Sequence, residues 1–133
     1  MIDIVIITHG LFGEELMLSA EMILGKQGSV HTIAIQPDRS VPEIAIELDK
    51  IIESGSKDGV LILTDMFGGS PSNVAFSYAG KAGVEIISGV NLPMLLKSFS
   101  GRMTGEGLTQ LANSCCEAGK NSIKLASELM KKR

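Results

Sequence analysis

A histidine and an aspartate hold equivalent places in this chain, each directly after a short apolar run. His9 follows the run Ile2–Thr8, and Asp65 follows the run Gly59–Thr64. Imidazole has an ordinary pKa near neutrality, so it can act as a nucleophile at cellular pH. A carboxylate that accepts a hydrogen bond from one ring nitrogen leaves the other nitrogen free to attack, and it stabilises the charge that develops on the ring. The pair therefore predicts nucleophilic catalysis by His9, with Asp65 orienting its ring.

A glycine-rich segment follows the aspartate. Gly68-Gly69-Ser70 stands ahead of a predicted helix, where successive backbone N–H groups can turn toward one point and bind an anion. Helix N-termini expected after both segments also favour a bound phosphate. Taken singly, each feature has a plainer interpretation: His9 as a capping or surface residue, Asp65 as a turn cap, and Gly68-Gly69 as a tight connection. Taken together at adjacent strand ends, they predict a phosphoryl-transfer site.

The elements that must position these residues alternate between strand and helix. Predicted strands cover Ile2–Thr8, Val30–Ile35, Gly59–Thr64 and Val84–Ser88. Predicted helices cover Glu14–Leu24, a segment capped by Ser40 and Glu43, a segment opened by Ser70-Pro71, and a short segment capped by Asn91. A long final helix is predicted from about Glu106 to Met130. Its apolar stripe consists of Leu108, Leu111, Cys115, Ala118, Ile123 and Leu129. Such alternation is typical of an α/β fold with a doubly wound, mainly parallel sheet and helices on both faces.

We expect a flavodoxin-like strand order, 2-1-3-4, with or without an extra edge strand. In that order the crevice for ligands lies between the first and third strands, at their carboxyl ends. Neighbouring strands are about 4.8 Å apart, so the side chains of His9 and Asp65 should reach each other. His31 lies within a predicted strand without an obvious partner, and we interpret it as structural.

Composition narrows the class of protein. The chain has 133 residues, 44% of them apolar, which predicts a single folded domain over residues 1–133. A net charge of −3 argues against a nucleic-acid binder. Cys115 and Cys116 are adjacent, which suits two buried thiols in a reducing compartment better than a disulfide. Without a secretory signal or a membrane-length apolar run, the expected location is cytoplasmic, with membrane contact only through partners.

Three stretches make the chain recognisable. Ile-Thr-His-Gly at residues 7–10, Asp-Met-Phe-Gly-Gly-Ser-Pro-Ser-Asn at 65–73 and Gly-Val-Asn-Leu-Pro-Met-Leu at 89–95 resemble the enzyme IIA component of mannose-family sugar phosphotransferase systems. The resemblance covers essentially the whole chain. It implies a flavodoxin-like homodimer and a phosphorylated histidine, here His9, modified at Nε2 while Asp65 holds the other ring nitrogen.

The resemblance also implies partners and phosphate contacts. The donor would be the phosphorylated histidine phosphocarrier protein, and the acceptor a histidine on a separate enzyme IIB. Ser70 would contact the phosphate or the ring with its hydroxyl, and Gly10 and Gly69 would offer backbone amides. No cofactor and no metal is expected, because one phosphohistidine is exchanged for another of similar energy. Phe67 departs from the better-known members, which often carry tryptophan at that position.

Other functions remain as alternatives. A related branch of the same family delivers phosphate to a dihydroxyacetone kinase. A histidine phosphatase would need arginine where Thr8 stands, and a metal chelatase would need a second histidine near the site. A flavin- or nucleotide-binding module would favour serine and threonine after the first strand, where Leu11–Glu15 is acidic and apolar. A receiver domain would need an acidic cluster, whereas the strand ends offer mainly Asp65.

Overall fold

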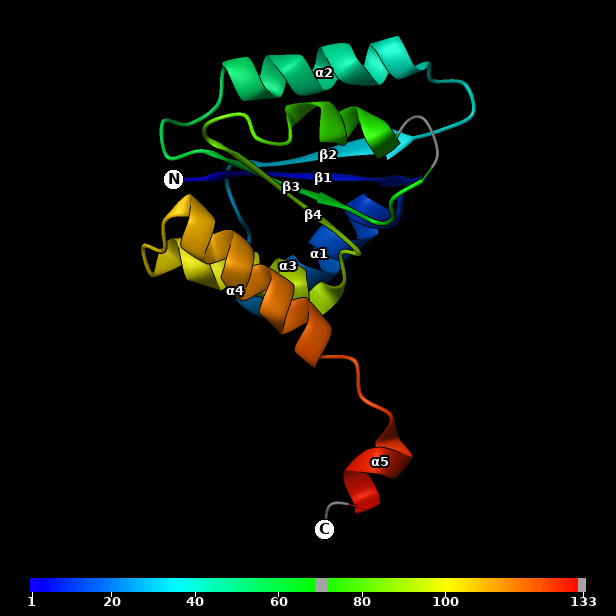
Figure 1. The fold of residues 1–133 in the computed structure, drawn as a ribbon, viewed down its shortest axis with the longest axis vertical. Helices are drawn as coiled ribbons and strands as arrows, with labels where there is room; N and C mark the ends of the chain where they lie inside the picture. The colour runs from blue at the N-terminus through cyan, green and yellow to red at the C-terminus, as the bar shows by residue number, and fades with distance from the viewer. Residues whose placement is uncertain (69–71, 132–133) are drawn as a thin grey trace.

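Four parallel strands form the centre of the computed structural model, which describes residues 1–68 and 72–131 (Figure 1). They are β1 (Asp3–His9), β2 (Val30–Ile35), β3 (Val60–Thr64) and β4 (Val84–Ser88), in the order β2-β1-β3-β4. The predicted order is thus confirmed. Within the described residues the sheet holds these four strands, so the optional edge strand is not part of it.

Helices cover both faces of the sheet, as predicted (Figure 1). On one face lie α1 (Phe12–Leu24), α3 (Leu92–Met103) and α4 (Leu108–Asn121), and on the other lie α2 (Val41–Glu53) and the 3₁₀ helix η1 (Ser72–Tyr78). Successive residues of a strand point to opposite faces, so β1, which is buried from Asp3 to Thr8, supplies both cores. Ile4 and Ile6 pack with Leu61, Leu95 and Phe99, whereas Val5 and Ile7 pack with Ile33, Ile44 and Ile62.

The prediction of one long final helix is wrong, because the structure has two helices there, α4 and α5 (Ala126–Lys131). The chain leaves helical geometry after α4 and resumes it in α5, which stands away from the body (Figure 1). The carbonyl of Gly119 accepts hydrogen bonds from the hydroxyl of Ser122 and from the side-chain amide of Asn91, instead of from the next helical turn. Side chains that satisfy the last carbonyls in this way end a helix. Ile123 and Leu129, expected on a buried stripe, are therefore exposed.

The helix expected from Ser70-Pro71 also differs. Both of these residues lie outside the described part of the chain, and the helix that follows them, η1, is a 3₁₀ helix of seven residues. At its end the N–H of Ala79 donates a hydrogen bond to the carbonyl of Phe76, three residues earlier. The hydroxyl of Ser77 donates to the carbonyl of Val74. Short 3₁₀ segments of this kind serve as connectors, here between β3 and β4.

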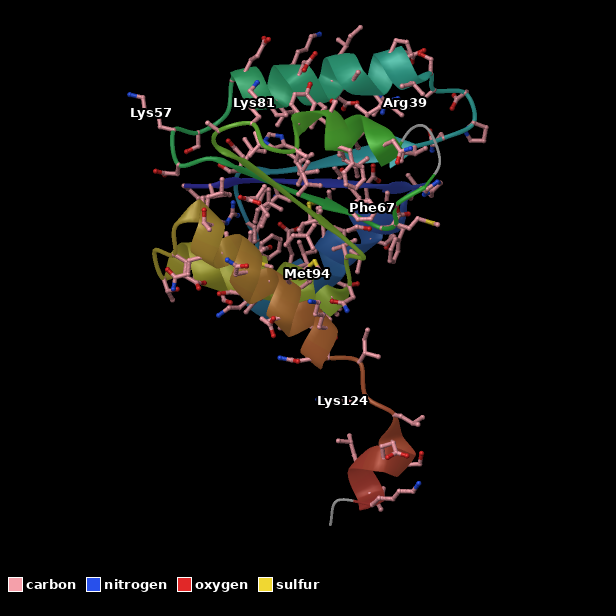
Figure 2. All side chains as sticks on the ribbon, viewed as in Figure 1. Arg39, Lys57, Phe67, Lys81, Met94 and Lys124 are labelled. Carbon is pink, nitrogen blue, oxygen red and sulfur yellow. The ribbon has the colours of Figure 1, made fainter. Side chains whose placement is uncertain are left out.

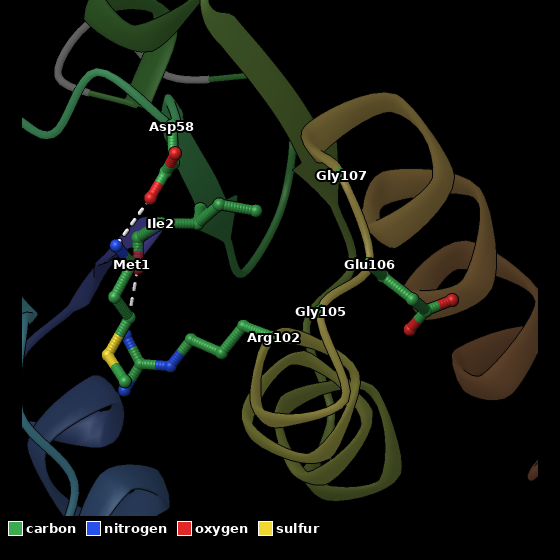
Figure 3. Close-up of a pocket in the computed structure, with 7 residues that line it drawn as sticks. All are labelled: Met1, Ile2, Asp58, Arg102, Gly105, Glu106 and Gly107. Carbon is green, nitrogen blue, oxygen red and sulfur yellow. Dashed lines mark hydrogen bonds and ion pairs between the residues drawn. The ribbon is translucent and has the colours of Figure 1, made fainter.

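The amino ends of the strands are held together by a buried arginine. Arg102, at the end of α3, is only 7% exposed and donates hydrogen bonds to the carbonyls of Ile2, Gly28 and Ser29. It lines a cavity of about 220 Å³ beside the first residues of the chain, shown in Figure 3. Since these carbonyls precede β1 and β2, one side chain fastens α3 to both strands.

Replacing Arg102 by Met should destabilise the fold without touching the carboxyl ends of the strands. Met keeps much of the aliphatic stem but removes the charged donor to the carbonyls of Ile2, Gly28 and Ser29, and a hydrogen bond to a charged group contributes about 1.5–3 kcal/mol. Urea unfolding should show a loss of at least about 2 kcal/mol. Lys57→Met, at an exposed position (Figure 2), is the control and should change stability by less than about 0.5 kcal/mol. Equal stabilities of the two variants would contradict this role of Arg102.

Candidate functional site

The predicted contact between His9 and Asp65 is present. His9 is the last residue of β1, and Asp65 directly follows β3. Nδ1 of the His9 ring lies 3.0 Å from Oδ2 of Asp65, and the backbone N–H of His9 donates to the same oxygen over 2.9 Å. The side chain of His9 is 50% exposed and that of Asp65 only 14%. The carboxylate thus forms the inner part of the site and the imidazole its accessible part.

The charge of Asp65 determines which nitrogen of His9 carries the proton. Burial alone would raise the pKa of Asp65, but hydrogen bonds from the backbone and ring of His9, and from the backbone N–H of Met66, hold the pKa below its ordinary value. At neutral pH the group is therefore a carboxylate, which can only accept hydrogen bonds. Nδ1 must then be the donor in the neutral ring, and Nε2 keeps a free lone pair. This is the tautomer that a nucleophilic histidine requires.

Sheet register and one glycine explain the placement of the His9 side chain. β1 lies beside β3, with Ile7 opposite Thr64, so the residues that follow come together at one edge. Gly10 then turns the chain with a φ of +58°, a value that glycine adopts without strain. Its N–H donates to the carbonyl of Ile35 over 2.8 Å, which ties the turn to the end of β2.

Four exposed apolar side chains follow His9 and Asp65 closely in the chain, and we call them the apolar rim. It consists of Leu11 and Phe12 at the start of α1 and Met66 and Phe67 after β3, each about half exposed. Phe67 (Figure 2) packs against Phe76 of η1, with the ring centroids 3.9 Å apart. Exposed apolar side chains next to a half-exposed imidazole are typical of a contact surface.

The predicted phosphate-binding residues are described only in part. Gly10 adjoins His9 in the turn, and Gly68 has a φ of +97° in the segment after Asp65. Gly69 and Ser70 lie outside the described residues. Their role as phosphate ligands stays a prediction, as does that of the two described glycines.

Three other candidates lie away from His9. His31 is in β2 near its amino end, and its Nε2 is 3.4 Å from a carboxylate oxygen of Asp3, a partner that the sequence did not predict. Both cysteines are free thiols; Cys115 is buried as expected, whereas Cys116 is only half-buried. Burial, with a contribution from neighbouring Glu106, raises the pKa of the Cys115 thiol to about 12, which makes it a poor nucleophile.

Sequence reasoning missed one contact beside the site. The hydroxyl of Thr8 accepts a hydrogen bond from the backbone N–H of Gly13 over 2.7 Å, and both residues are buried. The only available signals were indirect: Leu11, at the N-cap position of α1, is a residue that cannot cap, and a glycine stands in the first turn.

A family model described as PTS system fructose IIA component, where PTS is the phosphotransferase system, matches residues 3–116. The chain belongs to the mannose-type enzyme IIA family. It is thus an enzyme IIA component of the sugar phosphotransferase system, as the resemblance implied. In the part of this enzyme IIA that the structure describes, no helix has the length and apolarity needed to cross a membrane.

Known relatives and structures agree with this assignment. The mannose-specific EIIAB component of Escherichia coli K12 is 34% identical over 125 residues, which cover 92% of this chain and 39% of that protein. This chain therefore spans about two fifths of that relative's length. The fructose-specific EIIA component of Bacillus subtilis is 29% identical, over 99% of this chain and 91% of the relative. A crystal structure of EIIA from Streptococcus agalactiae superposes with a TM-score of 0.86 at 27% identity, covering 96% of this chain and 99% of the other.

Proposed function

We propose that this enzyme IIA carries phosphate on Nε2 of His9. The observation that carries the proposal is the hydrogen bond between His9 and the Asp65 carboxylate at the open end of the sheet. That contact leaves one ring nitrogen with a free lone pair, and half of the His9 side chain is exposed. The phosphate would come from the phosphorylated histidine phosphocarrier protein and pass to a histidine of an enzyme IIB, in the cytoplasm.

The proposed step exchanges one phosphorus–nitrogen bond for another. The Nε2 lone pair of His9 attacks the phosphorus of the donor's phosphohistidine in line, through a loose transition state. As that bond forms, the donor's bond to phosphorus breaks and its electron pair returns to the donor ring. Asp65 keeps the proton on Nδ1 and offsets the positive charge that develops on the His9 ring. In the transfer to enzyme IIB, the acceptor histidine attacks the same phosphorus, and the bond between phosphorus and Nε2 of His9 breaks.

Phosphate contacts complete the proposal. Backbone amides near Gly68 and Gly69, with the hydroxyl of Ser70, would donate hydrogen bonds to the phosphate oxygens, since amide-rich glycine segments bind anions. The N–H of Gly10 donates to the carbonyl of Ile35, so Gly10 would serve this site through its turn and not as a donor. The apolar rim formed by Leu11, Phe12, Met66 and Phe67 supports docking of both partners on the same surface. A small surface of this kind suits the brief encounters that a relay needs.

Intact-mass spectrometry tests the proposal directly. The protein is incubated with phosphoenolpyruvate, enzyme I and the phosphocarrier protein, and the mass is measured before and after brief exposure to acid and to base. We expect one added phosphate that acid removes and base does not, as a phosphohistidine requires. An unchanged mass in the presence of an active donor would refute the proposal.

We further propose that the protein is a homodimer. The segment from Ile123 to Lys131 supports this, because α5 buries none of its side chains, and Ile123, Leu125 and Met130 are 77%, 66% and 68% exposed. Isolated helices shorter than about 12 residues are marginal in water, so a six-residue helix needs a covering surface. The outer edge of β4 offers one, beside a cavity of about 320 Å³ that Phe76, Ile86 and Leu108 help to line.

A chain that ends at Asn121 should therefore be monomeric, whereas the full chain should be dimeric. Size-exclusion chromatography with light scattering measures both masses, and Lys26→Ala in the full chain is the control, because Lys26 is exposed, lies outside the C-terminal segment and should not alter the mass. The dimer proposal fails if the full chain is monomeric. If the shortened chain stays dimeric, the C-terminal segment is not its interface.

A further inference from the structure

The start of α1 is capped from outside the helix. Leu11 occupies the N-cap position but has no side-chain acceptor, and the N–H of Gly13 is satisfied instead by the hydroxyl of Thr8, 2.7 Å away. Thr8 is 1% exposed and precedes His9 in β1. The hydrogen bond therefore joins the two ends of the segment that contains His9.

Close packing reinforces this hydrogen bond. A Cβ atom on Gly13 would lie 3.0 Å from the Thr8 hydroxyl oxygen and 3.0 Å from a methyl carbon of Ile6. These distances are tighter than ordinary side-chain contacts, so only glycine lets α1 approach β1 this closely. Thr8 and Gly13 form a fitted pair, which we call the Thr8–Gly13 brace.

The brace acts where the other contacts of the segment do not. The backbone N–H of His9 bonds to Asp65, and that of Gly10 bonds to the carbonyl of Ile35. Both of these contacts fix the strand side of the turn. Within residues 1–68, the Thr8–Gly13 brace is the side-chain hydrogen bond that fixes the helix side of the turn.

We propose that Thr8 is a positioning residue for phosphoryl transfer, acting through the Thr8–Gly13 brace. The brace holds the first turn of α1, and with it Leu11 and Phe12 of the apolar rim, in a fixed place beside His9. Without the hydroxyl, the buried N–H of Gly13 loses its acceptor, and the first turn of α1 must open to reach water. Leu11 and Phe12 then no longer hold a fixed position beside the exposed side of the His9 ring. This inference rests on the proposed function of His9.

Two substitutions separate the hydroxyl from the shape of Thr8. Thr8→Val keeps the volume and removes the acceptor, whereas Thr8→Ser keeps the acceptor and removes a methyl group. We expect single-turnover transfer from the phosphorylated phosphocarrier to slow on the order of 10-fold in Thr8→Val, less than the 10²-fold that a 1 Å misplacement can cost. Thr8→Ser should retain most of the wild-type rate.

Gly13→Ala alters the other residue of the Thr8–Gly13 brace. The added methyl pushes α1 away from β1 while leaving the hydroxyl in place, so it should also slow transfer. If both changes act through one contact, the double variant should be little slower than the slower single variant, because coupled residues are not additive. Fully multiplicative losses would show that the two residues act separately.

The control distinguishes positioning from stability. Val60→Ala creates a small void at the opposite end of the sheet, and rates are compared at a temperature where melting curves show every variant folded. A purely structural role of Thr8 would lower the melting temperature and leave the rate per folded molecule unchanged. Wild-type rates in Thr8→Val would therefore overturn the inference, as would equal slowing in Val60→Ala.

A measurement without any partner keeps the inference separate from the relay. In ¹⁵N-labelled protein, the backbone N–H of Gly13 should be protected from solvent exchange by its hydrogen bond to Thr8, and Thr8→Val should speed its exchange more than Thr8→Ser does. If the wild type accepts no phosphate, the proposed function fails, while this signal still tests the brace. Identical exchange in wild type and Thr8→Val would refute the brace by itself.

Discussion

Replacing His9 by Gln should leave this enzyme IIA unable to accept phosphate. A glutamine amide has no lone pair of comparable nucleophilicity, because its nitrogen electrons are delocalised into the carbonyl. Loss of a covalent nucleophile removes the reaction path itself, so we expect a decrease of at least about 10⁴-fold, which is no detectable phosphate. Glutamine is polar and half of the His9 side chain is exposed, so the fold should persist.

His31→Gln is the matched control for this experiment. His31 is the second of the two histidines in the chain and lies near the amino end of β2, where its partner is Asp3. It should accept phosphate as the wild type does. Both variants are compared by intact mass after the same incubation, with melting temperatures to establish folding. Phosphate retained in a folded His9→Gln protein would move the carrier site to another residue.

The central sheet could be predicted from sequence because its cause is local and repeated. The two central strands, β1 and β3, are largely apolar runs, and their burial on both faces leaves little freedom in where they lie. The strand ends at His9 and Asp65 followed from the same runs. Their proximity needed only the strand order, since parallel strands that are neighbours bring their carboxyl ends together.

Contacts that depend on distant segments could not be predicted. The break after α4 depends on Asn91, which caps α3 and also donates to the carbonyl of Gly119 at the end of α4. Apolar spacing alone continued through that point, so Ile123 and Leu129 were placed on a buried stripe. The Thr8–Gly13 brace was missed for a related reason: a capping residue is normally sought beside the helix, and this one lies in the preceding strand.

Asp65 offers the second large effect, since it has two separable tasks. Asp65→Ala removes both the acceptor that keeps the proton on Nδ1 and the negative charge beside the ring, and we expect transfer to slow on the order of 10²-fold. Asp65→Asn can keep an acceptor at the same place but loses the charge, so its rate should fall between those of wild type and Asp65→Ala. Asp49→Asn, an exposed carboxylate on α2, is the control and should transfer at the wild-type rate.

The pH dependence of stability provides a second test of the same carboxylate. The folded protein holds the pKa of Asp65 below its ordinary value of 3.8. A lowered pKa means that the charged form stabilises the fold above the ordinary pKa, and that this contribution disappears as the pH falls through the lower, folded pKa. The melting temperature of the wild type should therefore exceed that of Asp65→Asn at neutral pH, and the two should converge in acid.

Transfer rates and melting curves together decide what Asp65 does. If Asp65→Asn transfers at the wild-type rate while its melting curve loses the acid dependence, the charge stabilises the fold without assisting catalysis. If both Asp65→Ala and Asp65→Asn transfer normally, the hydrogen bond to Nδ1 is not part of the mechanism, and His9 must obtain the correct tautomer elsewhere. The expected order, with Asp65→Ala slowest, requires that orientation and charge each lower the barrier, because only then does restoring the acceptor alone recover part of the rate.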